Sequence, residues 1–175
     1  NPMFHYLRKI SIIALCVSAL TACGFHLRGS QNAGSATLMT YQTLNIVGDT
    51  DSNIAQNLAN LMRGQVRVVD KTTPAQVTTE IGDVSHSKAI LTKNSQGRIT
   101  EYRLFGSVTI QAYDANKQPL ISPTRLTVTR TLSAGDGYTT GLDLEEARLA
   151  DDMDLELANQ IQYRLRAIRL TNAAK

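Results

Sequence analysis

The chain has 175 residues, enough for one domain with a sizeable hydrophobic core. Its formal net charge is +3, which falls to +1 if Arg8 and Lys9 are removed with an N-terminal signal, and it contains no Trp. This near balance of charge, with few aromatic rings for base stacking, argues against a nucleic-acid-binding protein.

The N-terminal segment has the features of a bacterial lipoprotein signal. Arg8 and Lys9 form a basic region, and residues 10–20 form an apolar run about half as long as a membrane-spanning helix. Leu20-Thr21-Ala22-Cys23 then supplies a processing site, with a Leu three residues before the Cys. We expect residues 1–22 to be removed as a signal peptide, of which residues 1–2 lie upstream of the first Met.

Cys23 is the predicted site of lipid attachment. Its acyl chains would hold the protein on a membrane, since each buried methylene contributes about 0.8 kcal/mol. The alternative is a secreted protein cleaved near Ala22, with Cys23 as a free thiol. In lipoproteins of this kind an Asp after the Cys marks inner-membrane retention, so Gly24 permits export to the outer membrane.

Residues 23–40 are predicted to be the lipidated Cys and a flexible tether, because residues 30–40 are small and polar. Residues 41–175 are predicted to form a single α+β domain. Cys16 would leave with the signal and Cys23 would be acylated, so the domain must be stable without disulfides.

The first half of this domain predicts a strand and a helix. Residues 41–47 alternate around Leu44 and Ile46, which is typical of a strand. Apolar residues then recur at helical spacing between candidate caps at residues 49–52 and Gly64. These residues are Ile54, Leu58, Leu61 and Met62.

Three further segments read as antiparallel strands. Residues 76–89 have a period of two whose phase slips at Gly82-Asp83, which predicts a bulge. Residues 101–112 alternate regularly, and residues 126–132 place apolar residues on one face and Thr on the other. A short apolar segment at residues 66–69 precedes them.

A long closing helix is predicted from about residue 142 to 170. Its apolar stripe consists of Met153, Leu157, Ile161, Leu165 and Ile168, with acidic residues early and basic residues late, as the helix dipole favours. Asp151, Asp152 and Asp154 are expected at an exposed helix start, so they are not predicted to be catalytic. The predicted fold is α+β, with two helices packed on one face of a four-stranded, mostly antiparallel sheet.

Motifs for catalysis or metal binding are missing from the sequence. Asp49, Asp51 and Asn53 begin like a calcium loop, but Ile54 replaces the required Gly and Asn60 the bidentate Glu. Neither His26 nor His86 has a second ligand at helical or turn spacing. We therefore predict a binding protein with no cofactor rather than an enzyme.

The residues after the lipidation site resemble a known family. Four parts of the chain are similar to the lipopolysaccharide-assembly lipoprotein family LptE, also called rare lipoprotein B. They are Cys23-Gly24-Phe25-His26-Leu27-Arg28, the first helix, Thr100-Glu101-Tyr102-Arg103-Leu104, and the last helix with its acidic residues early and basic residues late. The resemblance implies a protein of the outer membrane, on its periplasmic side, that plugs an LptD-type barrel, helps it to assemble and binds lipopolysaccharide.

The resemblance also implies basic contacts to lipid phosphates near the turn before the Glu-Tyr strand. Lys93 and Arg98 are the candidates, with Lys88 and Arg103 nearby, whereas residues 142–146 are apolar or acidic and offer no second basic contact. These four side chains could instead be ordinary solvated charges. Two other functions stay open: an accessory or pilot lipoprotein of another secretion machine, and an anchored hydrolase.

Overall fold

The computed structural model describes residues 39–135 and 140–170, so the predicted signal peptide, Cys23 and nearly all of the predicted tether lie outside the described residues. The elements run in the order β1 (Thr43–Gly48), α2 (Asn53–Arg63), β2 (Arg67–Val69), β3 (Val77–Lys93), β4 (Ile99–Asp114), β5 (Pro119–Ser133) and α3 (Thr140–Arg166).

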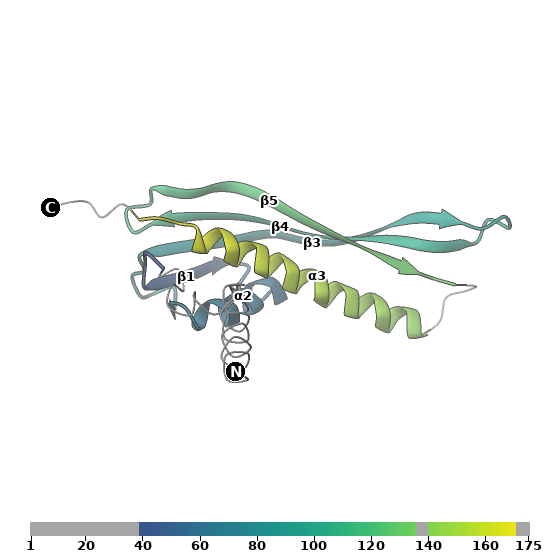
Figure 1. Cartoon of the computed structure of the whole chain (residues 1–175), viewed down its shortest axis with the longest axis horizontal. Coiled ribbons are helices and arrows are strands. Elements are labelled where there is room, and N and C mark those ends of the chain that lie inside the picture. The colour runs from purple at the N-terminus through teal and green to yellow at the C-terminus, as the bar shows by residue number, and fades with distance from the viewer. Residues whose placement is uncertain (1–38, 136–139, 171–175) are drawn as a thin grey trace, which may run out of the picture. The chain divides into compact units, whose positions relative to one another are not determined.

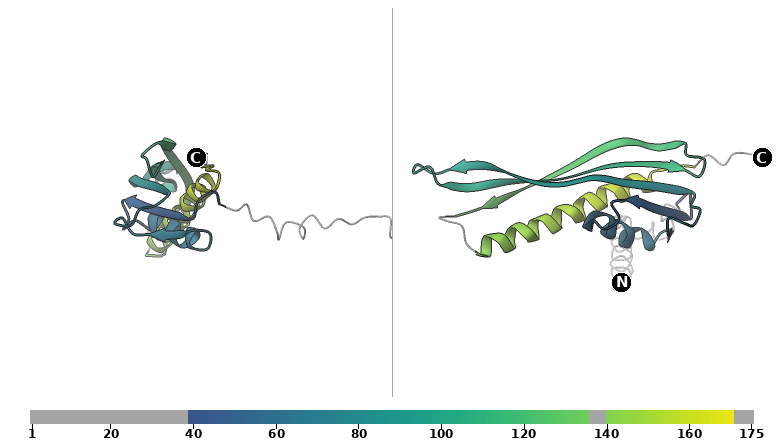
Figure 2. Two further views of the ribbon diagram at one scale, coloured as in Figure 1. Left: turned by 90° about the vertical axis from the view of Figure 1, so that its left-hand side faces the viewer. Right: turned by 180° about the vertical axis from the view of Figure 1, so that it is seen from behind.

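One mixed sheet of five strands, in the order β2-β1-β3-β4-β5, forms the centre of the fold. Strand β1 is parallel to β2 and β3, and the pairs β3–β4 and β4–β5 are antiparallel. Both α2 and α3 pack on one face of this sheet (Figures 1 and 2). The predicted α+β fold is confirmed, and the fifth strand is β2, which pairs through only three residues with Thr43–Asn45.

Helix α2 begins and ends at the predicted residues. The Ser52 hydroxyl accepts a hydrogen bond from the Ala55 amide at 3.2 Å, which satisfies one of the free donors of the first turn. Gly64 caps the other end. Ile54, Leu58 and Met62 are fully buried against the sheet and α3, so the apolar stripe holds the helix in place.

Strands β4 and β5 confirm the predicted alternation. Leu104, Val108 and Ile110 of β4 are buried beneath the helices, while Arg103 and Thr109 point to the opposite face. Gly106 lies under α3, where an added Cβ would stand 3.4 Å from the Met153 Cβ. The absence of a side chain at this position allows the helix and sheet to approach closely.

The predicted bulge is present in β3. The register with β4 shifts between Gly82 and Ser85, and Asp83 adopts a positive φ of 48°. Before the bulge, odd-numbered residues such as Ile81 face the helices; after it, even-numbered residues such as His86 do. Because the bulge inserts one extra residue, every side chain after it points to the face opposite to the one it would have in an uninterrupted strand.

Helix α3 closes the fold along the length of the sheet (Figure 1). Its predicted stripe is confirmed, because Met153, Leu157, Ile161 and Leu165 are almost completely buried. The Tyr41 hydroxyl donates to the Leu165 carbonyl at 2.9 Å and so ties the entry to the fold to the end of α3. Neither described helix combines the length and apolar character required to span a bilayer.

Candidate functional site

Two of the four predicted lipid-binding residues lie together at the tip of the β3–β4 hairpin. Lys93 ends β3 and Arg98 ends the turn before β4, and both side chains are exposed. The Asn94 carboxamide oxygen accepts hydrogen bonds from the amides of Gln96 and Arg98 at 3.0 and 2.9 Å. These bonds fix the turn, so the two cations lie near one rigid tip.

The other two predicted residues point to opposite faces of the same hairpin. Lys88 lies on the helix side, where its Nζ is 2.7 Å from a Glu146 carboxylate oxygen and 5.0 Å from the centre of the Tyr102 ring. Arg103 lies on the face of the sheet that α2 and α3 do not cover, which we call the open face. There it is across from Ala89 on β3 and Thr131 on β5. The four residues therefore belong to one hairpin but do not share one surface.

The hairpin tip is also apolar. Ile90 and Leu91, two or three residues before Lys93, leave 53% and 40% of their surfaces exposed. Leu144 in the first turns of α3 is 71% exposed. In Figures 1 and 2 the hairpin reaches past the start of this helix. Exposed aliphatic groups beside two cations are suited to an amphiphile with anionic head groups.

A carboxylate that we expected at an exposed helix start is instead buried in the middle of α3. Asp154 is only 4% exposed, and its carboxylate lies 2.7 Å from His86 Nε2 on β3. The expectation was wrong for Asp154 because this residue lies three and four residues before the buried Leu157 and Ala158, and so it shares their face of α3. His86 and Met153 also line a cavity of about 160 Å³ between β3, β4 and α3.

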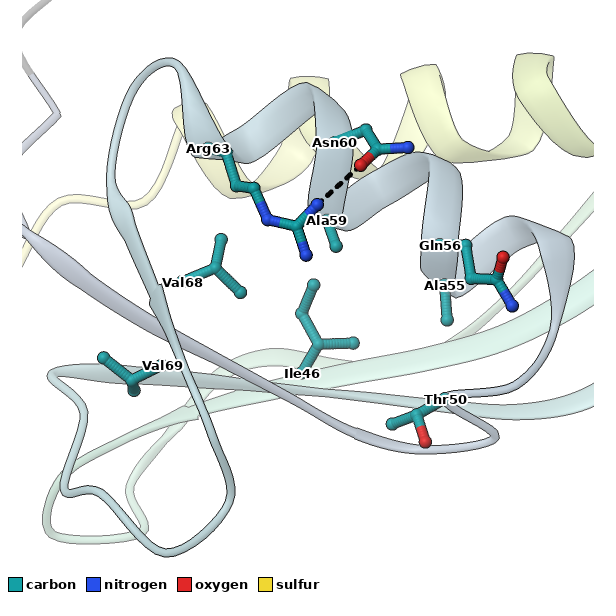
Figure 3. Close-up of a pocket in the computed structure, with 9 residues that line it drawn as sticks. All are labelled: Ile46, Thr50, Ala55, Gln56, Ala59, Asn60, Arg63, Val68 and Val69. Carbon is teal, nitrogen blue, oxygen red and sulfur yellow. Dashed lines mark hydrogen bonds between the residues drawn. The ribbon is translucent and has the colours of Figure 1, made fainter.

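A second hollow lies between α2 and the β1–β2 edge, with a volume of about 360 Å³ (Figure 3). Its apolar wall consists of Ile46, Ala55, Ala59, Val68 and Val69. On its rim the Arg63 guanidinium donates to the Asn60 side-chain oxygen at 2.6 Å, which is the dashed line in Figure 3. Arg63 is the only ionisable residue among those that line this hollow.

These hollows can bind groups, but they do not assemble the parts of a catalytic site. Within residues 39–135 and 140–170, no group of three His, Cys, Asp or Glu side chains could hold a metal ion. In the described part of the chain, His86 and Asp154 bond to each other, and neither side chain bonds to a Ser, Thr or Cys side chain. The sequence contained one signal for this pair, the phase slip at Gly82-Asp83, which turns His86 towards the helices.

Comparisons with solved structures show where this fold occurs. Rare lipoprotein B from Shewanella oneidensis is 16% identical, with a TM-score of 0.62, covering 70% of this chain and 92% of its own. Lipoprotein B from Nitrosomonas europaea is 25% identical, with a TM-score of 0.62, covering 82% and 88%. A minor lipoprotein from Acinetobacter baumannii is 19% identical, with a TM-score of 0.60, covering 73% and 92%.

A comparison with curated proteins found no match. The family model of LptE, described as "Lipopolysaccharide-assembly", matches residues 41–165, which include every described strand and nearly all of α3. The chain therefore belongs to the LptE family of non-enzymatic lipopolysaccharide-assembly lipoproteins.

Proposed function

We propose that this protein is anchored to the periplasmic side of the outer membrane through acyl chains on Cys23. There it plugs an LptD-type barrel, helps that barrel to assemble and binds lipopolysaccharide on its way to the outer leaflet. Residues 1–22 are the signal peptide in this proposal, residues 23–40 the lipidated tether, and residues 41–175 the domain that enters the barrel. Family membership supports the role in lipopolysaccharide assembly.

The open face of the sheet is the observation that carries the plug proposal. Within β3, β4 and β5 this face presents hydroxyl-bearing side chains in every strand: Ser85, Ser87, Ser107, Thr109, Thr127, Thr129 and Thr131. A surface of this kind is poorly suited to lipid, but it suits the polar interior of a large transmembrane barrel.

The hairpin tip is the proposed contact for lipopolysaccharide. Lys93 and Arg98 would bind lipid phosphates through charge-assisted hydrogen bonds, while exposed Ile90 and Leu91 would contact acyl chains. Lys88 and Arg103 would contribute longer-range attraction from the two faces of the hairpin, since Lys88 already interacts with Glu146.

Affinity purification of the full chain from outer membranes tests the plug proposal. We expect one large barrel protein to be recovered in an amount equal to the tagged chain. Recovery of no barrel would contradict the proposal, and recovery of a different partner would favour the accessory role in another machine. The mass of the N-terminal peptide tests the anchor, because an unmodified Cys23 is incompatible with it.

Charge reversal tests the lipid contact. In the variant Lys93→Glu/Arg98→Glu, two attractive charges become repulsive towards phosphate, so we expect lipopolysaccharide binding to the purified protein to fall about tenfold or more. Lys71→Glu/Lys117→Glu is the matched control, because it makes the same charge change at two exposed turn residues outside the β3–β4 hairpin. Equal binding by both variants would remove Lys93 and Arg98 from the site.

A further inference from the structure

The open face of the sheet carries a polar cluster that spans three neighbouring strands. Arg125 Nη2 on β5 donates to the Ser107 hydroxyl on β4 at 2.6 Å and to the Ser85 hydroxyl on β3 at 3.3 Å. The two serine hydroxyls are themselves 2.8 Å apart. Ser107 is only 5% exposed although it lies on this face, in keeping with an arginine side chain that bonds to it from the next strand.

The bulge at Asp83 is what brings this cluster together. Ser85 is the first residue after the register shift, and it pairs with Ser107 on the open face. If β3 continued without the extra residue, Ser85 would share the buried face of Val77, Thr79 and Ile81. The bulge has therefore placed the Ser85 hydroxyl beside Arg125.

Arg125 differs from Arg130 and Arg148 in the charge around it. Arg130, five residues along β5, forms an ion pair with Glu156, and Arg148 pairs with Glu145 and Asp152. Among the described residues, no carboxylate lies within ion-pair distance of Arg125. The guanidinium is held by neutral hydroxyls, so its positive charge is oriented but not neutralised.

Such an arrangement favours a single carboxylate as the ligand. A guanidinium presents five N–H donors in a planar fork that matches a carboxylate, and the two serines reduce the entropy cost of holding it in place. Arg103 is six residues away in the β4–β5 register, about 20 Å along the strands, so it cannot share one multiply charged phosphate with Arg125.

The surroundings of Arg125 fit a protein surface better than a lipid. Its direct neighbour on β4 is Thr109, and Thr127 follows on the same face of β5. Short hydroxyl side chains at these two positions allow another polar surface to approach closely, and they give an acyl chain little apolar surface to contact.

We propose that Arg125, held by Ser85 and Ser107, is the point at which the open face binds an acidic side chain of its protein partner. This inference rests on the proposed function, in which the partner is the inner wall of the barrel. Arg125 would help to fix the orientation of the sheet relative to that wall, because a charge-assisted pair at one defined position, about 20 Å along the strands from Arg103, restricts how the two surfaces can meet.

The test uses the tagged full chain expressed in its own cells, with the variants Arg125→Glu and Arg125→Gln. We expect Arg125→Glu to lower the amount of barrel recovered per chain at least about fivefold, and Arg125→Gln to lower it less, since it adds no repulsion. Arg166→Glu is the matched control, because it makes the same charge change at an exposed position at the end of α3. Thermal unfolding of each purified variant confirms that the fold is retained.

The outcomes separate this inference from the proposed function. If the wild-type chain recovers no barrel, the plug proposal itself fails. If the wild type and Arg125→Glu recover equal amounts, the plug proposal stands and the role of Arg125 is overturned. Loss of lipopolysaccharide binding by Arg125→Glu with unchanged barrel recovery would also overturn it. If Arg125→Glu recovers the barrel again once an acidic lumen residue of the barrel is changed to Lys, the ion pair between these two positions is established.

Discussion

Gly48 ends β1 in a conformation that other residues rarely adopt. Its φ is +90°, and an added Cβ would stand 2.2 Å from the Ile81 carbonyl oxygen, which accepts a hydrogen bond from the Asp49 amide. The Gly48→Ala variant is expected to lose about 2 kcal/mol or more of unfolding free energy, from backbone strain and from the steric clash. Urea unfolding of the purified domain measures this loss.

Gly64→Ala is the control for this substitution. Gly64 has a φ of −76°, and nothing lies within 4 Å of the position of its Cβ. We expect its unfolding free energy to stay the same or to rise by about 0.4–1 kcal/mol, because alanine restricts the unfolded chain. Equal losses in the two variants would contradict the proposed reason for Gly48.

Tyr41 predicts a dependence of stability on alkaline pH. Burial raises the pKa of the Tyr41 phenol above its ordinary value of 10.0, and its hydroxyl donates to the Leu165 carbonyl. Stability from this group is complete below pH 10.0 and is lost as pH rises above that value, because the unfolded chain ionises first. Tyr41→Phe should therefore flatten the fall in urea midpoint above pH 10.0.

At neutral pH the same Tyr41→Phe variant should be less stable than the wild type by about 1 kcal/mol, since it lacks the hydrogen bond to Leu165. An alkaline fall of the same steepness in both proteins would show that another group is responsible.

The contact between His86 and Asp154 gives a third prediction at this scale. His86→Ala leaves the buried Asp154 carboxylate without this partner, so we expect the unfolding free energy to fall by about 1–3 kcal/mol. The double variant His86→Leu/Asp154→Leu should recover most of this loss, because apolar pairs often replace buried polar pairs without cost. A double variant no more stable than His86→Ala would argue against this account.

Among the elements, helix α3 is unevenly supported along its length. Between Leu142 and Met153 no residue is fully buried, whereas Leu157, Ala158, Ile161 and Leu165 are. Its first half packs through Leu142 and the half-buried Leu149 and Ala150, and its ion pair to β3, Glu146 with Lys88, contributes little. We expect amide hydrogens of residues 143–152 to exchange about tenfold faster than those of residues 157–165, as measured by mass spectrometry or NMR.

Uniform protection along α3 would show that the hairpin side of the fold is as firmly packed as the other.

Regular periodicity made much of this fold predictable. The alternation of β4 and β5 and the stripe of α2 depend on neighbouring residues only, so the sequence revealed them directly. Strand β2 is different: three residues cannot display a period, and its partner Thr43–Asn45 lies beyond a whole helix. Such pairing depends on how the chain returns after α2, which local sequence does not encode.

The same distinction applies to the candidate sites. Lys93 and Arg98 are five residues apart, so their common position at a turn could be predicted. Asp154 contacts His86 at a separation of 68 residues, and Arg125 contacts Ser85 at 40. Both contacts depend on the phase of β3 after Asp83; the sequence indicated this shift, but it did not indicate which residues of other elements would lie opposite.

For the whole molecule, the two faces of the sheet have different roles. One face buries the core beneath α2 and α3, and the other leaves hydroxyl groups and Arg125 available to a partner. Family membership shows a non-enzymatic role in lipopolysaccharide assembly. The proposed anchor at Cys23, the hairpin tip and the open face would then hold one protein to a membrane, a glycolipid and a barrel.

Depletion of this protein from its own cells tests the account most directly, with newly made lipopolysaccharide measured at the outer leaflet. The account predicts that surface lipopolysaccharide falls several-fold and that the wild-type chain restores it, while the Lys93→Glu/Arg98→Glu chain restores it less well. Normal delivery of lipopolysaccharide to the outer leaflet in depleted cells would contradict it.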